Sequence, residues 1–490
     1  MKKNFNVKLF YRLLGFTKPY KLNFIFVTFS AIIISFFSIL NQYFLKIAVD
    51  EYITPKDYLG LINIIILMIA ILCFQVIFQF LFIFFTNLLG QKVVFDLRTK
   101  LFRTIINFKM SYYDKSSVGR LVTRTVSDME TIASIFSQGL FMIFADLILM
   151  FSVLTVMIVL SLELSLIILV ILPFVMFATR LFQRAMKVAF NEVRSEVANL
   201  NSFVQERLSG IKEIQIFNRQ KIESKNFEKI NERHKKAWLK TVWYNSIFFP
   251  IAEISISISV GLIVWYAGNN IIKLDNFVSL GTIFLFIQLS QMLFRPLRQI
   301  ADKFNTLQMG MVAAKRVFEI VDSNYYIPDN GNSNLKDLDG DIIFENVNFS
   351  YTRNNNVLNN INLTIKKGEK IAIVGATGSG KSTIVKLIMR LYDIEEGEIK
   401  INKKNIKNFK LSDLRSSISL VNQDIFLFAD TILKNITLFN KNVSKKDVEK
   451  AAQKIGVLNF INKLPGGFNY DVKERGVMLS EGQRQIISFL

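Results

Sequence analysis

One stretch of this chain limits its possible folds more than any other. Residues 61–85, LINIIILMIAILCFQVIFQFLFIFF, carry no charged side chain. A helix of about 20 apolar residues is long enough to cross a bilayer. A helix in a soluble core is usually shorter and keeps a polar stripe. Because hydrophobic residues also make up 51% of the 490-residue chain, the stretch predicts a membrane protein.

Five further apolar segments resemble this one in length and composition. The six spans are expected at 22–45, 59–89, 138–160, 162–182, 246–268 and 278–300. The connections after the second and fourth spans are long, polar and helical in pattern, whereas those after the first, third and fifth are short. A helical pattern also continues past the sixth span. The sequence therefore predicts an all-α, six-helix membrane domain over 22–322 with two long loops.

The distribution of basic residues orients these spans. Lys and Arg outnumber acidic residues in 1–21, 91–130 and 180–245, whereas acidic residues outnumber Lys in the short loop 48–60. Basic loops remain on the cytoplasmic side. Both termini and both long loops are therefore expected in the cytoplasm, with the spans in the cytoplasmic membrane. The net charge of +21 is thus explained by contact with the lipid bilayer, and no nucleic-acid partner is expected.

The first 21 residues form a separate basic segment. Lys2, Lys3 and Lys8 precede the first span, but no small-residue cleavage site follows it, so a signal peptide is not indicated. We expect an interfacial amphipathic helix over 1–21, with its cations near lipid headgroups. The single cysteine, Cys73, excludes a disulfide within the chain.

The composition changes after the membrane domain. Residues 323–341 are rich in Asn, Asp, Gly and Ser and are expected to be a linker. From residue 342 onward, short β-rich runs alternate with helical patterns, which is typical of an α/β domain. The predicted fold is therefore a six-helix transmembrane domain followed by an α/β P-loop nucleotide-binding domain over 342–490.

The segment KIAIVGATGSGKST (370–383) carries the main functional signal. An expected buried strand, IAIV, leads into a match to G-x-x-x-x-G-K-[ST], and a helical pattern follows. Backbone N–H groups of such a loop surround phosphate oxygens. Lys381 is expected to reach the β- and γ-phosphates of ATP, and the Ser382 hydroxyl to bind Mg²⁺. The predicted nucleotide-binding residues of this segment are Gly375, Thr377, Gly378, Ser379, Gly380, Lys381, Ser382 and Thr383.

With the six spans and two further motifs, the chain resembles the half-transporters of the ABC exporter family, in the multidrug and lipid-flippase branch. VNFSY resembles the family's adenine platform, which implies that Tyr351 stacks on the base. LVNQDIFLFADTILKNI resembles the Q-loop segment, which implies that Gln423 contacts Mg²⁺ and the γ-phosphate region as a catalytic residue. From the residues alone, Tyr351 could instead be a core aromatic and Gln423 a surface loop residue.

DVKERGVMLSEGQRQ resembles the loop and signature motif of the same family. The resemblance implies a head-to-tail dimer in which Ser480 and Gly482 cover the γ-phosphate bound by the partner chain, while Gln483 shapes the turn. It also implies a second half-transporter as partner, identical or different. Glu481 and Lys473 replace family glycines. Glu481 either repels the partner's triphosphate or points to solvent.

The family pattern continues beyond what this sequence contains. The resemblance implies an apolar strand ending in Asp-Glu after the signature helix, then a switch histidine; the only histidine, His234, precedes the phosphate loop. We therefore expect Leu490 to mark the end of a fragment or of a truncated reading frame, and no hydrolysis at the chain's own site as it stands. The implied activity of the whole protein is ATP-driven export of an amphipathic drug or lipid. The alternative is a non-catalytic ATP-binding half that supports an active partner.

Two loop segments resemble the coupling segments of the family. The first includes Tyr112, Tyr113 and Asp114, and the second includes Ile216, Phe217 and Asn218. The resemblance implies that the second segment docks on the partner's ATPase domain.

Two carboxylates, Asp146 and Glu253, lie near the inner ends of spans three and five. They could favour cationic substrates, but pairing with Lys or Arg from a neighbouring helix is the favoured interpretation.

Overall fold

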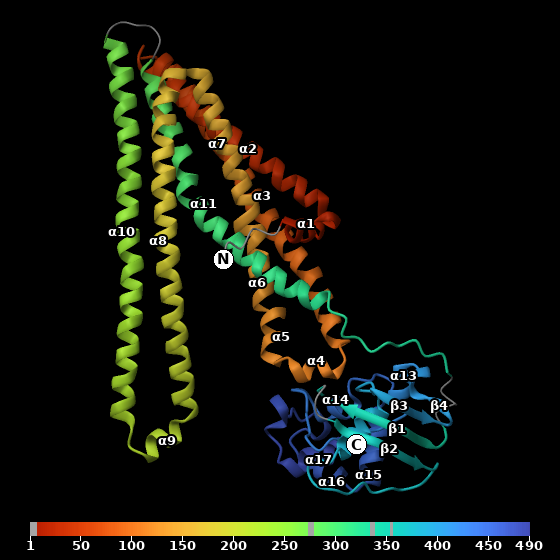
Figure 1. The fold of residues 1–490 in the computed structure, drawn as a ribbon. Helices are drawn as coiled ribbons and strands as arrows, with labels where there is room; N and C mark the ends of the chain where they lie inside the picture. The colour runs from red at the N-terminus through yellow and green to blue at the C-terminus, as the bar shows by residue number, and fades with distance from the viewer. Residues whose placement is uncertain (1–6, 273–278, 334–338, 353–355) are drawn as a thin grey trace. The chain divides into compact units, whose positions relative to one another are not determined.

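A computed structural model describes residues 7–272, 279–333, 339–352 and 356–490 (Figure 1). The chain divides into two compact units: Met1–Phe108 with Tyr113–Tyr325, and Lys109–Tyr112 with Tyr326–Leu490. Three predictions fall partly outside the described residues. They concern residues 1–6 of the interfacial helix, the first residue of the sixth span, and residues 334–338 of the linker.

The membrane unit is helical. Six helices in the described part of the chain are long and apolar enough to cross a membrane, as the sequence predicts. The longest helices extend well beyond the length of a span, because the polar loops keep a helical pattern. The elements are α1 (Val7–Gly15), α2 (Lys21–Ile47), a π-helix (Ala48–Ile53), α3 (Tyr58–Ile106), α4 (Met110–Lys115), α5 (Val118–Thr125), α6 (Ser127–Ser134), a second π-helix (Ile135–Leu140), α7 (Phe141–Leu160), α8 (Leu162–Ser209), α9 (Ile211–Ile216), α10 (Gln220–Ile272) and α11 (Leu280–Val321).

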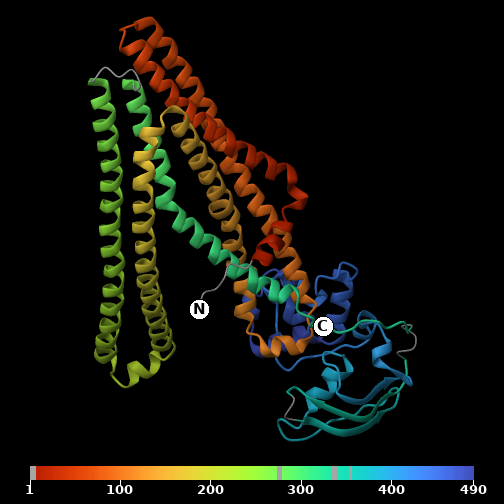
Figure 2. The same ribbon diagram turned by 45° about the horizontal axis from the view of Figure 1, so that its top comes forward.

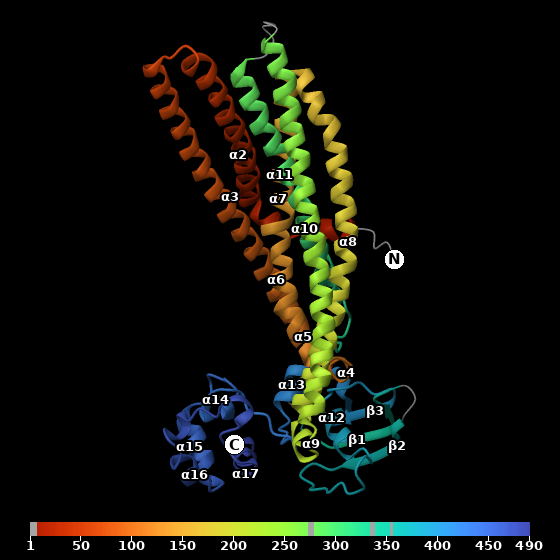
Figure 3. The ribbon, with the colours of Figure 1, turned by 90° about the vertical axis from the view of Figure 1, so that its left-hand side faces the viewer.

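The helices α8 and α10 form a long antiparallel pair that α9 joins at one end (Figure 2). Ion pairs hold the two helices together outside the apolar segments. Lys240 Nζ lies 2.7 Å from a Glu192 carboxylate oxygen, and Arg207 Nε lies 2.6 Å from Glu223 Oε2. The helices α2 and α3 form a second antiparallel pair (Figure 3).

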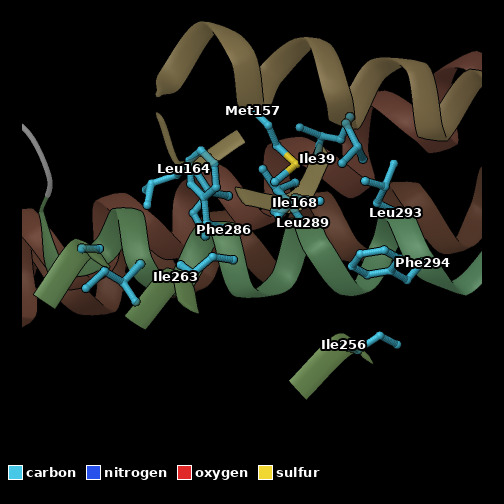
Figure 4. Close-up of a cluster of buried hydrophobic side chains, with 14 of the residues drawn as sticks. Ile39, Met157, Leu164, Ile168, Ile256, Ile263, Phe286, Leu289, Leu293 and Phe294 are labelled. Atoms are coloured by element: carbon cyan, nitrogen blue, oxygen red, sulfur yellow. The ribbon is translucent and has the colours of Figure 1, made fainter. Parts of the chain in front are cut away.

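An apolar core joins five of the membrane helices (Figure 4). Met157 of α7, Ile168 of α8 and Phe286 and Leu289 of α11 are fully buried in it, and Ile39 of α2 packs beside them. Between membrane helices, close packing replaces the hydrophobic effect as the stabilising force. The core therefore fixes α11 in the middle of the unit.

The second unit contains a four-stranded antiparallel sheet in the order β2-β1-β3-β4. Phe344 of β1 lies opposite Leu363 of β2 and Ile399 of β3, and its side chain is buried. The elements are β1 (Ile342–Ser350), β2 (Asn356–Ile365), α12 (Lys381–Ile388), β3 (Glu396–Ile401), β4 (Lys404–Asn405), α13 (Leu411–Ser416), α14 (Ile432–Thr437), α15 (Lys445–Lys454), α16 (Leu458–Asn462) and α17 (Glu481–Phe489).

Part of the segment expected to be a linker lies on this second unit. Arg390 donates a hydrogen bond of 2.9 Å to the carbonyl of Pro328, and the N–H of Leu411 donates one of 2.9 Å to Asp329. Ser333 N–H donates to the carbonyl of Asn408 at 3.0 Å. Residues 328–333 are thereby attached to the nucleotide-binding unit.

The structure does not contain the buried strand that the sequence predicts at IAIV. Residues 371–374 form no strand, and the side chains of Ile371, Ile373 and Val374 are 41%, 37% and 87% exposed. A strand requires neighbours to cover its side chains and pair its backbone. None of the four strands that the structure describes pairs with this segment, so the apolar sequence alone does not make it a strand.

Candidate nucleotide-binding site

The phosphate loop leads directly into α12. Gly378 and Gly380 both have φ of +86°, a left-handed conformation that glycine adopts without a steric cost. This backbone turn lets α12 begin at Lys381, so the N-terminal end of this helix directly follows the loop. Lys381 Nζ donates to the carbonyl of Gly375 at 2.9 Å and to that of Ala376 at 2.8 Å. The loop therefore closes around its own lysine.

The other predicted residues of the loop lie on its open side. Thr377, Ser379 and Ser382 are exposed, and Ser379 N–H donates to the carbonyl of Ala376 at 3.2 Å. Helix N-termini and concave runs of backbone N–H groups bind anions. An accessible loop with a lysine and a helix start is therefore suited to a triphosphate.

Tyr351 lies beside the phosphate-loop helix. Its hydroxyl is 3.1 Å from Thr383 Oγ1, although the two residues are 32 positions apart. Its ring meets that of Tyr392 edge to face at 5.1 Å, and Lys386 Nζ lies 5.7 Å from its centroid. The structure therefore brings Tyr351 next to the loop and packs it within an aromatic cluster.

Unlike Tyr351, Gln423 is exposed. It lies in an exposed bend between α13 and α14. Among the described residues, its side chain makes no hydrogen bond to the phosphate loop. A contact between Gln423 and a bound nucleotide therefore stays a prediction.

The signature residues form the start of α17. Ser480 is the N-cap: its Oγ accepts from Gln483 N–H at 3.3 Å, and Gln483 Oε1 accepts from Ser480 N–H at 2.9 Å. This reciprocal pair satisfies two N–H groups at the helix start. Gly482 has open space around its Cα, and Glu481 is exposed. The Gln483 side chain thus shapes the helix start, while Gly482 and Glu481 face outward.

A small helical subdomain supports α17. Ile432 N–H donates to the carbonyl of Tyr470 at 3.0 Å, and Val472 N–H donates to that of Asp430 at 3.1 Å. Beside this backbone bridge lies a buried cluster. Its members are Leu427, Ile432, Val448, Ala452, Ile461, Phe468, Val472, Leu479 and Ile487. The signature therefore has a packed support that also includes the segment following Gln423.

Lys473, one of the two residues that replace a family glycine, has a strained backbone. Its φ of +59° and ψ of −174° fall in a region that is essentially restricted to glycine. Asp471 holds it there, because its carboxylate accepts from Lys473 N–H at 2.9 Å and from Nζ at 2.8 Å. These hydrogen bonds lower the pKa of Asp471 and raise the pKa of Lys473.

The described residues contain no group of three or more His, Cys, Asp or Glu side chains that could hold a metal ion. This is compatible with Mg²⁺ at a phosphate loop, where a hydroxyl and the nucleotide's own phosphates supply oxygen ligands. Ser382 fits that requirement, since it lies exposed in the first turn of α12, next to Lys381.

The membrane unit confirms one expectation about its carboxylates. Asp146 of α7 forms an ion pair with Lys303 of α11, and both side chains are mostly buried. Glu253 also has an interaction partner in the structure. Sequence reasoning expected a cationic partner for Asp146 but did not identify Lys303. The only signal was a lysine on the helical extension of the sixth span.

A membrane bundle joined in one chain to a phosphate-loop domain with a capped signature helix defines an ATP-binding membrane transporter. Residues 24–297 match the family described as the ABC transporter transmembrane region, and residues 358–490 match the family described as ABC transporter. The chain therefore belongs to the ABC transporter family and is a multi-pass membrane protein with the domain order of an exporter half-transporter.

Known relatives support this assignment over the whole chain. An uncharacterized ABC transporter ATP-binding protein of Bacillus subtilis, YknV, is 32% identical over 492 residues, covering 100% of this chain and 81% of the relative. A putative ABC transporter ATP-binding protein of Streptococcus pneumoniae, exp8, is 31% identical, covering 98% and 82%. The ATP-dependent lipid A-core flippase of Escherichia coli strain K12 is 32% identical, covering 91% and 76%.

Proposed function

We propose that this protein is one half of a dimeric exporter that uses ATP to move an amphipathic drug or lipid across the cytoplasmic membrane. The phosphate loop and the signature helix in one domain, fused to six spans, carry this proposal. The similarity to a lipid A-core flippase supports an amphipathic substrate. The loop charges support cytoplasmic termini, because Lys and Arg concentrate on the side of the long helical extensions.

The outward-facing signature supports a site shared between two chains. Gly482 and Glu481 at the start of α17 are exposed, and within the part of the chain that the structure describes a Cβ built at Gly482 would meet nothing within 4 Å. Within the capping box Gln483 N–H is already bound to Ser480, so the N–H groups of Glu481 and Gly482 are the ones that would meet an anion there. In the proposed head-to-tail dimer, Ser480 and Gly482 would contact the γ-phosphate of the nucleotide bound by the partner chain.

Each site residue has a defined role in this proposal. Lys381 and the loop N–H groups would hold the β- and γ-phosphates, and Tyr351 would stack on adenine. Mg²⁺, held by Ser382 and Gln423, would neutralise phosphate charge when bound. Gln423 would also report nucleotide binding to the membrane domain, since it directly precedes the segment packed against the signature subdomain.

Two features support coupling between the domains. Lys109–Tyr112, in the first long loop, belong to the same compact unit as the nucleotide-binding domain. At the end of the α8–α10 pair, Ile216 and Phe217 are 64% and 72% exposed. Large apolar side chains exposed at the tip of a polar loop indicate a docking surface. We assign α9 to contact with the partner's ATPase domain, which would transmit closure of the ATP dimer to the spans.

A second candidate function is a half that binds ATP but does not hydrolyse it. Glu481 favours this alternative, because it places a carboxylate where the partner's triphosphate would lie. The strained Lys473, eight residues before Glu481, favours it as well, since it alters the loop that leads to the signature.

Reconstitution distinguishes these functions. The protein, alone and with the product of any neighbouring half-transporter gene, is placed in liposomes with a fluorescent phospholipid and, separately, a cationic dye. Export by the protein alone, abolished by Lys381→Ala, supports a homodimer. Export that requires the second subunit and survives Lys381→Ala in this chain supports the non-catalytic half. Absence of ATP hydrolysis and export in every combination would refute the proposed transporter.

A further inference from the structure

The outer end of the sixth membrane helix has an acidic cap supplied by a distant part of the chain. Gly281 N–H donates to Asp50 Oδ1 at 2.7 Å, and Ser279 Oγ donates to the other carboxylate oxygen. Asp50 is 231 positions away, in the π-helix that ends the first span. Because α11 has no acidic residue in its own first turn, Asp50 is the anion that complements its dipole.

Glycine permits this contact. A Cβ atom at position 281 would lie 2.4 Å from the carbonyl oxygen of Lys46 and 2.7 Å from Asp50 Cγ. Backbone therefore packs directly on backbone where α2 ends and α11 begins. Ser279 is also the N-cap of α11, since its Oγ accepts from Thr282 N–H at 3.2 Å. One serine thus joins the helix start to the carboxylate.

The contact lies at the end of the bundle opposite α9 (Figure 1). Farther along α11, packing is apolar and fully buried at Phe286, Leu289 and Leu293. At the outer end, the contact consists of hydrogen bonds to the partly exposed Asp50 carboxylate. Water can replace these hydrogen bonds when the helices separate. The π-helix that carries Asp50 is a rare irregularity of a kind often found at functional sites.

We propose that Asp50, Ser279 and Gly281 form an outer latch that holds the first and sixth spans together until ATP binding opens the outer side. This inference rests on the proposed transport function, which makes the α9 end cytoplasmic. Asp50 is a positioning residue in this scheme, because it accepts hydrogen bonds from Ser279 and Gly281 at the start of α11. Opening of the latch would separate α2 from α11 at their outer ends.

Cross-linking tests the latch. Asp50→Cys and Ser279→Cys are combined in a Cys73→Ser background, in full-length protein assembled in liposomes, with a short bifunctional thiol reagent. We expect rapid cross-linking without nucleotide and at least about tenfold slower cross-linking after trapping with ATP and orthovanadate. We also expect a disulfide at this pair to lower ATP hydrolysis about tenfold, with recovery on reduction. Equal cross-linking rates in both states, or full hydrolysis in the oxidised protein, would overturn the latch.

A second variant tests the close approach of α2 to the start of α11. Gly281→Ala should push α2 and α11 apart and speed thiol labelling of the Ser279→Cys variant in nucleotide-free protein several-fold. Gly261→Ala in α10 is the matched control, because its Cβ would meet nothing within 4 Å. Equal labelling of the two variants would contradict the latch. Reduced protein that neither traps vanadate nor hydrolyses ATP would refute the transport function itself, and the latch with it.

Discussion

The ammonium group of Lys303 forms an ion pair with the carboxylate of Asp146. This ion pair joins α7 to the part of α11 that follows the apolar core. Their side chains are only 15% and 18% exposed. A carboxylate whose charge is neutralised by a cation on a neighbouring helix presents little charge to a substrate. The pair therefore argues that Asp146 holds two helices together and does not select cationic substrates.

Removing one partner of this pair should destabilise the membrane unit. Asp146→Ala leaves the Lys303 ammonium mostly buried without a partner, and we expect a loss of roughly 1–3 kcal/mol in stability. Thermal unfolding of purified protein, followed by tryptophan fluorescence, measures this loss. The double variant Asp146→Ala/Lys303→Ala should lose less than the sum of the single variants. Additive losses, or a change in preference for cationic dyes in the double variant, would contradict a structural role.

The strained backbone at Lys473 leads to a second prediction. Lys473→Gly should relieve the unfavourable φ and raise the unfolding temperature by about 2–4 °C. Lys473→Ala is the control, since it removes the ammonium but keeps the strain. Calorimetry that showed equal unfolding temperatures for Lys473→Gly and Lys473→Ala would rule out backbone strain as the cause.

The ion pair between Asp471 and Lys473 predicts that the stability of the fold depends on pH. The hydrogen bonds from Lys473 lower the pKa of Asp471 from its usual 3.8. A carboxylate whose pKa is lowered by folding stabilises the folded state above the unfolded pKa, and this contribution disappears as pH falls through the folded pKa. Wild type and Asp471→Asn should therefore differ in unfolding temperature at neutral pH and converge as the pH falls through the lowered folded pKa of Asp471. A difference that stays constant across this range would show that the carboxylate charge is irrelevant.

Much of the architecture follows from local sequence patterns. The six spans and the long helices α8 and α10 could be predicted, because apolar length and helical periodicity act within one segment. The phosphate loop could be predicted for the same reason, since its glycines and lysine lie within eight positions of one another. The start of α17 follows from the cap between Ser480 and Gln483, three positions apart.

Contacts between distant segments could not be predicted in this way. Lys303 and Asp146 are 157 positions apart, and Gly281 and Asp50 are 231 apart, so neither pair leaves a periodic signal. At residues 371–374, by contrast, the sequence predicts a strand that the structure does not contain. An apolar run indicates that a segment can be buried, but burial depends on which strands lie beside it.

The position of Tyr351 predicts a role in nucleotide affinity. Tyr351→Ala removes the aromatic face, and we expect about a tenfold weaker affinity for ATP, as for the loss of one base–aromatic stack. Equilibrium binding of a fluorescent ATP analogue measures the change. Tyr351→Phe loses only the hydroxyl contact with Thr383 and should bind within about twofold of wild type. If both variants bind like wild type, Tyr351 is a packing residue of the aromatic cluster.

The exposed carboxylate of Glu481 predicts an effect on dimer formation. In the proposed dimer it faces the partner's triphosphate, where like charges repel each other. Glu481→Gln should therefore strengthen ATP-dependent association about two- to fivefold at low salt. The gain should shrink at high ionic strength, because salt screens exposed charges. Association is measured by light scattering of full-length protein in detergent with ATP. Glu449→Gln, at a partly exposed position in the same subdomain, is the control. If the gain does not depend on salt, or also occurs in the control, Glu481 does not face the bound nucleotide.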